Sequence, residues 1–562
     1  MCSSDLGAEA AAGGRERRIV IGFTGLDWLV LAAFFGALVA IVVWVLKQKE
    51  EDTADYFLAG RNAGWVAVGA SIFASNIGSE HLVGLAGTGY ESGMAMAHWE
   101  MHAWLILVLG WVFVPFYARS KVFTMPEFLE RRYSPGARWF LSLISLVSYV
   151  LTKVAVTVYA GGVVFKTVLG IDEWMGIDFF WISGIGLVAL TGLFTIFGGM
   201  KAVLYTSILQ APVLIIGSVV ILISGLSAVG GWSEVERHVG ANIHLIRPAS
   251  DPQFPWTGVL LGSAIIGFWY WCTDQYIVQR TLSAKSQKHA RRGAIFAAYM
   301  KLLPVFIFLV PGMIAYTMVQ KGLLELKSSD EAFPALVSAL LPAGLRGVVV
   351  GGLVAALMSS LASLFNSSAT LFTVDFYKKL RPDSTERHLV FVGRVATATV
   401  VGLGVAWIPL MRSIAAVLYE YLQNVQSLIA PGIAAVFLLG VFSTRATSAG
   451  GTVGLVFGFV MGMLRLVLDV FSERLDPEGW LYAIVAMNWL HYCILLFFAT
   501  LAVILIVSAF TEKPSPEKLR GLTFASSTPE QKAETRASWS YWDVLHTAVI
   551  LSVIVAFYIY FW

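Results

Sequence analysis

The chain is poor in charge. Only 13% of its 562 residues are Asp, Glu, Lys or Arg, whereas 57% are apolar. Because a soluble domain typically carries about 25% charged residues, this composition excludes a soluble enzyme, a disordered protein and a nucleic-acid-binding protein. The formal net charge of +3 is too small to indicate an electrostatic partner.

Cysteine is scarce as well. Cys2, Cys272 and Cys493 lie far apart, so they provide neither a disulfide framework nor a CxxC metal site. Short alternating strands, the mark of a transmembrane barrel, are also lacking. Instead the mean hydropathy is +0.74 and apolar runs reach about 20 residues, the length that spans a bilayer. The sequence therefore predicts an all-α polytopic membrane protein.

The apolar runs predict fourteen transmembrane helices. Residues 1–26 precede them as a tail that we expect to be disordered, and no signal-peptide cleavage pattern follows the first run. Residues 511–540, with three prolines among charges, are expected to form a cytoplasmic tether to the last helix. The predicted spans are 27–47, 64–88, 94–117, 139–168, 175–199, 203–229, 256–273, 293–318, 344–374, 388–408, 411–441, 447–472, 484–510 and 541–561.

Lysine and arginine are distributed unevenly between alternate loops. One set of loops holds 24 of them and the opposite set holds 7, or 10 with the N-terminal tail. Because cytoplasmic loops are enriched in Lys and Arg, the richer set is predicted to face the cytoplasm. We therefore expect a multi-pass protein of the plasma (inner) membrane with both termini outside the cytoplasm.

Two predicted spans are interrupted by weak helix formers. Residues 74–79 of the second span read ASNIGS, and the seventh span ends in the polar, bulky residues 269–274, WYWCTD. Glycine costs about 1 kcal/mol in a helix interior, and Ser and Asn compete for backbone hydrogen bonds. Broken helices five spans apart are typical of an inverted-repeat transporter with its site at the breaks. The alternative is that small residues here only permit close helix packing.

A serine pair in the ninth span suggests a cation site. Ser359 and Ser360 follow Ala356 by one helical turn, so all three can face one point. Backbone carbonyls freed at a helix break, together with hydroxyls, are hard oxygen ligands for a small cation. Serine pairs also join membrane helices by hydrogen bonds, which is the structural alternative.

Long ordered motifs extend these features over residues 25–510. They are ASNIGxxH at 74–81 with GLAGTG at 84–89, WYWCTDQ at 269–275 with VQR at 278–280 and LSAK at 282–285, LMSSL at 357–361 with FNS at 365–367 and LFT at 371–373, and Pro431 with IAAVF at 433–437. With these motifs the chain resembles the sodium/glucose cotransporters of the solute:sodium symporter family. It looks closer to the animal sugar carriers than to the proline or pantothenate branches.

The resemblance implies a five-plus-five inverted repeat over about 64–441, with one helix before it and three after it, inside a transporter domain of 27–510. It implies a sodium site made of the backbone oxygens of Ala74, Ile77 and Ala356 and the hydroxyls of Ser359 and Ser360. It implies an outer gate of Leu85, Trp99 and Tyr419, with Tyr270 as the inner gate. The sugar site it implies comprises Asn76, His81, Glu100, Tyr270, Trp271, Lys301 and Gln423.

These side chains suit a sugar, whose hydroxyls both donate and accept hydrogen bonds. Glu100 accepts, Lys301 donates and the two amides do either, while Trp271 offers a flat face to the C–H side of the ring. The structural alternatives are that Glu100 and Lys301 form only an ion pair and that the aromatic residues only pack.

Some positions depart from the family. Relatives that bind a second sodium use an aspartate after a Tyr-Thr pair and a threonine after the serine pair. Here Ser207 and Ala362 occupy those positions, and both changes remove oxygen or charge. We therefore expect one sodium per sugar. Gly267 and Gln426 differ from the animal glucose carriers near the sugar.

The predicted function is sodium-coupled symport of a glucose- or galactose-like hexose by alternating access, with sodium as coupling ion and no other cofactor. The alternative is symport of another small solute, such as myo-inositol, proline or sialic acid. A channel would need repeated ligand rings, which are lacking. His98 and His102 have a zinc-compatible spacing, but the metalloprotease motif places Glu directly after the first His, so we do not expect an enzyme.

Overall fold

The computed structural model describes residues 23–47, 53–78, 80–120, 122–414 and 418–562. It is mostly helical, at 81%, and its only sheet within these residues is a two-stranded hairpin of β1 (Glu173–Trp174) and β2 (Ile177–Asp178). The prediction of a mostly helical fold is therefore confirmed. Nearly all of the tail predicted at 1–26 lies outside the described residues.

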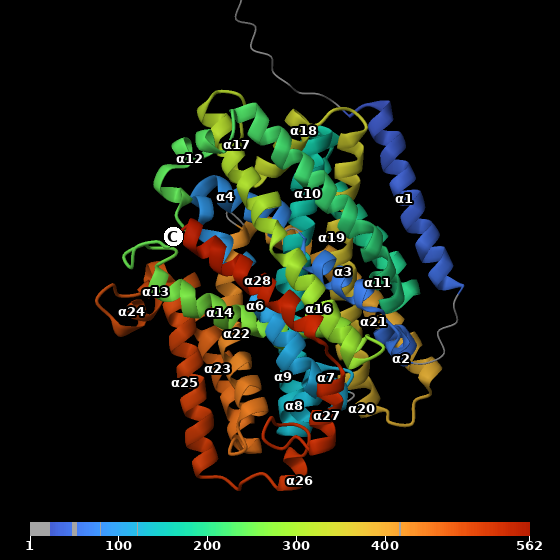
Figure 1. Cartoon of the computed structure of the whole chain (residues 1–562), viewed down its shortest axis with the longest axis vertical. Helices are drawn as coiled ribbons and strands as arrows, with labels where there is room; N and C mark the ends of the chain where they lie inside the picture. Colours follow the sequence, from blue (N-terminus) through green and yellow to red (C-terminus); the bar gives the residue numbers. More distant parts are fainter. Residues whose placement is uncertain (1–22, 48–52, 79, 121, 415–417) are drawn as a thin grey trace, which may run out of the picture.

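The α-helices form one bundle (Figure 1). Their bounds are α1 (Gly25–Leu46), α2 (Thr53–Leu58), α3 (Trp65–Asn76), α4 (Ala86–Ser92), α5 (Ala97–Glu100), α6 (Ala103–Val108), α7 (Val114–Ser120), α8 (Met125–Arg132), α9 (Pro135–Ser148), α10 (Ala155–Leu169), α11 (Phe179–Val229), α12 (Trp232–Val239), α13 (Trp256–Gly258), α14 (Ala264–Phe268), α15 (Gln275–Leu282), α16 (Gln287–Lys301), α17 (Val310–Gln320), α18 (Ala332–Leu340), α19 (Leu345–Thr370), α20 (Lys378–Leu380), α21 (Glu386–Ile414), α22 (Leu418–Phe442), α23 (Ser448–Val470), α24 (Trp480–Ala486), α25 (Trp489–Ala509), α26 (Pro516–Leu519), α27 (Pro529–Ala537) and α28 (Tyr541–Tyr560).

Tighter or wider helical turns join many of these helices. The π-helical turns are η2 (Glu80–Leu85), η4 (Leu109–Phe113), η5 (Tyr149–Val154), η7 (Val259–Ser263), η8 (Trp269–Thr273), η9 (Val305–Leu309) and η11 (Leu371–Tyr377), and the 3₁₀ turns are η1 (Ala59–Arg61), η3 (Gly93–Met96), η6 (Gly240–Ile243), η10 (Ser329–Glu331) and η12 (Ser472–Arg474). Such π turns are frequent at functional sites.

Nine helices in the described part of the chain are long and apolar enough to cross a membrane. Each of the fourteen predicted spans falls on helical structure, but breaks divide several of them into shorter helices. The count of fourteen and the repeat layout stay predictions. The predicted spans 175–199 and 203–229 form two helical stretches of α11 joined by a kink at Gly199, whose φ is +49°. A Cβ atom at this position would lie 2.6 Å from the backbone oxygen of Tyr56.

Both predicted interruptions are present. The helix α3 ends at Asn76, and Ile77 is extended with φ −82° and ψ 95°. In the seventh span η8 ends at Thr273, Asp274 is extended, and its side chain caps α15. Carbonyls in the last turn of an interrupted helix lose their helical N–H partners, so each break leaves backbone oxygens available to other donors.

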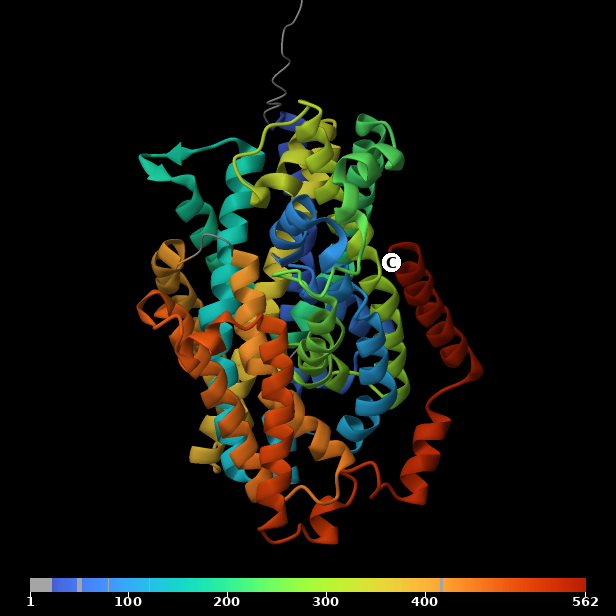
Figure 2. The same ribbon diagram turned by 90° about the vertical axis from the view of Figure 1, so that its left-hand side faces the viewer.

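The segment 511–540 runs beneath the bundle and leads to α28 on one side (Figure 2). It is held in place by Lys518, which donates to the backbone oxygen of Tyr133, and by Arg119, which donates to Ser527 and Thr535. At the far end of α28, the oxygen of Phe561 accepts a hydrogen bond from the amide of Leu245. The C-terminus thus lies beside the segment 230–255.

Candidate transport site

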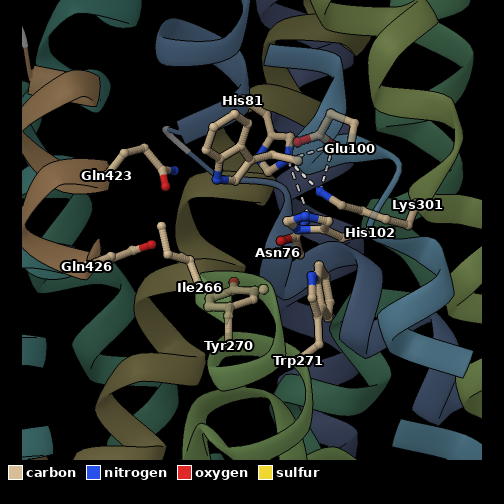
Figure 3. Close-up of a pocket in the computed structure, with 12 residues that line it drawn as sticks. Asn76, His81, Glu100, His102, Ile266, Tyr270, Trp271, Lys301, Gln423 and Gln426 are labelled. Carbon is tan, nitrogen blue, oxygen red and sulfur yellow. Dashed lines mark hydrogen bonds and ion pairs between the residues drawn. The ribbon is translucent and has the colours of Figure 1, made fainter. Parts of the chain in front are cut away.

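Twelve residues from both broken spans and three neighbouring spans enclose a cavity of about 50 Å³ (Figure 3). One water molecule needs roughly 10–15 Å³ of such space, so the cavity has room for a few waters and must widen to admit a hexose. Its lining consists of Asn76, His81, Trp99, Glu100, His102, Ile266, Gly267, Tyr270, Trp271, Lys301, Gln423 and Gln426. All seven residues predicted to bind sugar are among them.

A buried polar cluster forms one wall of the cavity. Nζ of Lys301, the last residue of α16, lies 2.6 Å from Oε2 of Glu100, and Nε2 of His81 lies 3.3 Å from the same oxygen. The amide nitrogen of Asn76, where α3 breaks, is 3.3 Å from Nε2 of His81. All four side chains are at most 4% exposed. The wall therefore offers a cation, an anion, an amide and an imidazole to one ligand.

Aromatic side chains from η8 form another wall of the cavity. The rings of Tyr270 and Trp271 are perpendicular, with centroids 4.9 Å apart. Nζ of Lys301 lies 5.4 Å from the Trp271 ring, and Nζ of Lys153 lies 4.6 Å from the Tyr270 ring. Gln423 and Gln426 of α22 point in from the side opposite Glu100 and Lys301 (Figure 3). This combination of a flat apolar face and amides is suited to a polyhydroxylated ring.

The predicted outer gate is only partly described. Leu85 is fully buried, and Trp99 is 6% exposed; Trp99 stacks on Trp489 at 5.8 Å and meets Phe254 edge-on at 6.2 Å. The side chain of Tyr419 lies outside the described residues. Trp489 begins α25, beyond the predicted repeat, and no sequence signal connected it with the gate.

Five lining residues were not among the predicted sugar ligands: the gate residue Trp99, the two departures Gly267 and Gln426, and His102 and Ile266. Nε2 of His102 lies 3.3 Å from Oγ of Ser263. A Cβ atom at Gly267 would lie 2.5 Å from Nδ1 of His102, so the glycine leaves room for this imidazole. The departure at Gly267 noted in the sequence and the histidine at 102 are thus in contact.

The α3 break meets α19 at a second polar cluster, which we call the serine junction: Ser75, Ser207, Ser359, Ser360 and Ser363. Oγ of Ser360 donates to the backbone oxygen of Ser75 at 3.1 Å, and the hydroxyls of Ser75 and Ser363 are 2.7 Å apart. Gly78 lies so close to Ser360 that a Cβ atom would collide with its hydroxyl. Ala74, Ile77 and Ala356, whose oxygens are the predicted sodium ligands, are buried at this contact.

Oxygen is the only ligand type that the serine junction offers. Oγ of Ser359 lies 3.4 Å from Oγ of Ser207, which belongs to α11. Ser207 in turn donates to the oxygen of Val203 at 2.6 Å. Hydroxyls and carbonyls without a carboxylate fit a small, hard, monovalent cation, and the structure places both predicted serine ligands here.

His98 points away from the transport cavity. Its Nδ1 lies 2.8 Å from the hydroxyl of Tyr558, and its Nε2 lies 3.0 Å from the oxygen of Leu245. His98 therefore joins α5 to α28. No group of three His, Cys, Asp or Glu side chains among the residues described could hold a metal ion.

With this geometry in place, comparison with known proteins decides the family. The sequence model of the sodium:solute symporter family matches residues 56–458. The chain belongs to the sodium:solute symporter family. This confirms the resemblance drawn from the broken-helix and serine motifs, and it makes the chain a sodium–solute symporter in general terms.

Curated relatives of this family member include two kinds of cotransporter. Sodium/glucose cotransporter 1 of Ovis aries is 37% identical over 530 residues, covering 86% of this chain and 79% of the relative. Sodium/myo-inositol cotransporter 2 of Bos taurus is 38% identical over 537 residues, covering 89% and 78%. Both are membrane transporters, not enzymes.

A solved structure shows the same fold. A sodium-coupled sialic acid symporter in a substrate-bound, outward-open state superposes with a TM-score of 0.73, covering 88% of this chain and 99% of that chain at 21% identity. At this identity the likeness concerns the fold and not the solute.

Proposed function

We propose that this symporter couples the entry of one sodium ion to the uptake of one hexose by alternating access. The observation that carries the proposal is the transport cavity, where Glu100, Lys301, Asn76 and Trp271 surround one space. The sodium/glucose cotransporter at 37% identity supports a sugar as solute. The stoichiometry rests on Ser207 and Ala362, which supply neither the carboxylate nor the threonine hydroxyl of a second sodium site.

The serine junction supports the coupling. Sodium bound between the α3 break and α19 would hold these two elements together, and Asn76 at the same break also lines the cavity. Because sodium would bind one conformation more tightly than the other, it shifts the population toward that conformation. The reciprocal effect is that sugar binding strengthens sodium binding.

The available energy is sufficient for uphill transport. One charge that crosses a potential of ~100 mV releases about 2.3 kcal/mol, and a tenfold sodium gradient adds about 1.4 kcal/mol. Their sum corresponds to roughly 500-fold accumulation of sugar at one-to-one coupling.

A cyclic polyol is the second candidate solute. The sodium/myo-inositol cotransporter at 38% identity favours it, and myo-inositol offers the same ring of hydroxyls to the cavity. The two proposals differ only in how the wall around His102, Gly267 and Gln426 fits the ring substituents.

The test is a solute panel. Proteoliposomes with an inward sodium gradient are offered labelled glucose, galactose, myo-inositol, proline and sialic acid in turn, each with and without sodium. We expect sodium-dependent uptake of a hexose at the lowest solute concentration. Uptake of proline or sialic acid alone would overturn the proposed solute class.

A further inference from the structure

Arg280 is a buried guanidinium close to the serine junction. It lies in α15, and its side chain is among the largest fully buried ones of the chain, at 1% exposed. Its Nε donates to Oγ of Ser75 at 3.0 Å. Its two terminal nitrogens donate to no atom in the described part of the molecule.

Among the residues that the structure describes, Arg280 has no carboxylate of its own to balance its charge. Asp274 is the described carboxylate that interacts with it electrostatically, but Oδ2 of Asp274 lies 3.4 Å from Nζ of Lys153, and Oδ1 accepts from the hydroxyl of Tyr149. Two buried cations therefore share one carboxylate. Both also flank the ring of Tyr276, at 3.9 Å for Nζ of Lys153 and 5.1 Å for Cζ of Arg280.

This excess positive charge is connected to the serine junction by short links. The hydroxyl of Tyr276 donates to the backbone oxygen of Ser75 at 2.5 Å, and the same oxygen accepts from Ser360 at 3.1 Å. Arg280 itself bonds the side chain of Ser75. A buried charge is screened much less by salt than an exposed one, so Arg280 acts on any cation held between the α3 break and the hydroxyls of Ser359 and Ser360.

We infer that Arg280 sets the sodium affinity of this symporter by repelling the ion at the serine junction, which keeps binding weak enough for release. The inference rests on the proposed function, because it requires sodium at this junction. Arg280 contacts neither the proposed sugar site nor the ion. It acts on the ion through its electrostatic potential and through its hydrogen bond to Ser75.

The test compares the neutral variant Arg280→Gln with the charge-retaining variant Arg280→Lys. Initial rates of hexose uptake into proteoliposomes are measured over a series of external sodium concentrations, with choline replacing sodium at constant ionic strength. At an effective dielectric constant of about 20, a unit charge several ångströms from the ion still changes the binding free energy of that ion substantially. We therefore expect Arg280→Gln to reach half-maximal uptake at about tenfold lower sodium, with a lower maximal rate because release slows, while Arg280→Lys stays close to wild type.

A second variant protects the test against a folding defect. Lys153→Gln removes the other cation and leaves Asp274 free to balance Arg280, so sodium activation should shift in the same direction. A merely structural role for Arg280 would weaken sodium activation in both Arg280 variants, and that result would overturn the inference, as would unchanged sodium activation in Arg280→Gln and Lys153→Gln. Uptake by the wild type that ignores sodium would instead overturn the proposed function itself.

Discussion

Variants of Glu100 and Lys301 can show whether this ion pair only stabilises the fold or also binds sugar. Each side chain is at most 5% exposed, and their charged atoms are 2.6 Å apart. Removing one partner of a buried pair typically costs about 3–5 kcal/mol because it leaves an uncompensated charge. Replacing both partners is often close to neutral. Each single variant, Glu100→Gln or Lys301→Gln, should therefore lower the unfolding temperature in detergent. The double variant should regain most of the lost unfolding temperature.

Sugar uptake by the double variant should stay impaired even though its stability recovers. Hydrogen bonds to charged groups contribute about 1.5–3 kcal/mol each, so losing two of them raises the sugar concentration for half-maximal uptake by roughly a hundredfold or more. The assay is uptake of labelled glucose by the double variant over a sugar concentration series at saturating sodium. A stable double variant with wild-type sugar activation would show that the pair only supports the fold.

Three further outcomes are expected. Ser359→Ala removes a proposed sodium ligand and should raise the sodium concentration needed for half-maximal uptake. The control Ser368→Ala, on the same helix, removes a buried hydroxyl that has no partner in the described chain, and it should leave that concentration unchanged. Equal shifts in both variants would contradict the proposed sodium site. Gly267→Ala places Cβ 2.5 Å from Nδ1 of His102. Overpacking of about 1–3 kcal/mol should raise the sugar concentration for half-maximal uptake roughly 5- to 150-fold and leave sodium activation unchanged. Wild-type sugar activation would show that the cavity wall relaxes to accept the methyl group. His98 is hydrogen-bonded to Tyr558 and Leu245, so uptake should be insensitive to a zinc chelator. Loss of uptake that added zinc restores would instead support a zinc site at His98 and His102.

Much of the fold could be predicted because local and global signals agree. The apolar runs mark the helices, and the weak helix formers at 74–79 mark the place where α3 ends. The family resemblance names Glu100 and Lys301 as sugar ligands, and the structure places their charged atoms 2.6 Å apart, in keeping with the high cost of an unpaired charge in a membrane interior.

What could not be predicted depends on contacts between distant segments. Trp489 reaches Trp99 only through the packing of α25, and nothing in its local sequence differs from other interfacial tryptophans. His98 and Glu100 are two positions apart in a short helix and point to different neighbours. The excess charge around Arg280 emerges only when Lys153 and Asp274 are brought together by η5 and α15.

The most direct test of sodium-driven sugar uptake is the accumulation of labelled glucose in proteoliposomes with an inward sodium gradient and an inside-negative potential. We expect the internal concentration to rise well above the external one and to fall to the external level when choline replaces sodium. Glucose entry that is the same with choline as with sodium would contradict sodium-driven uptake.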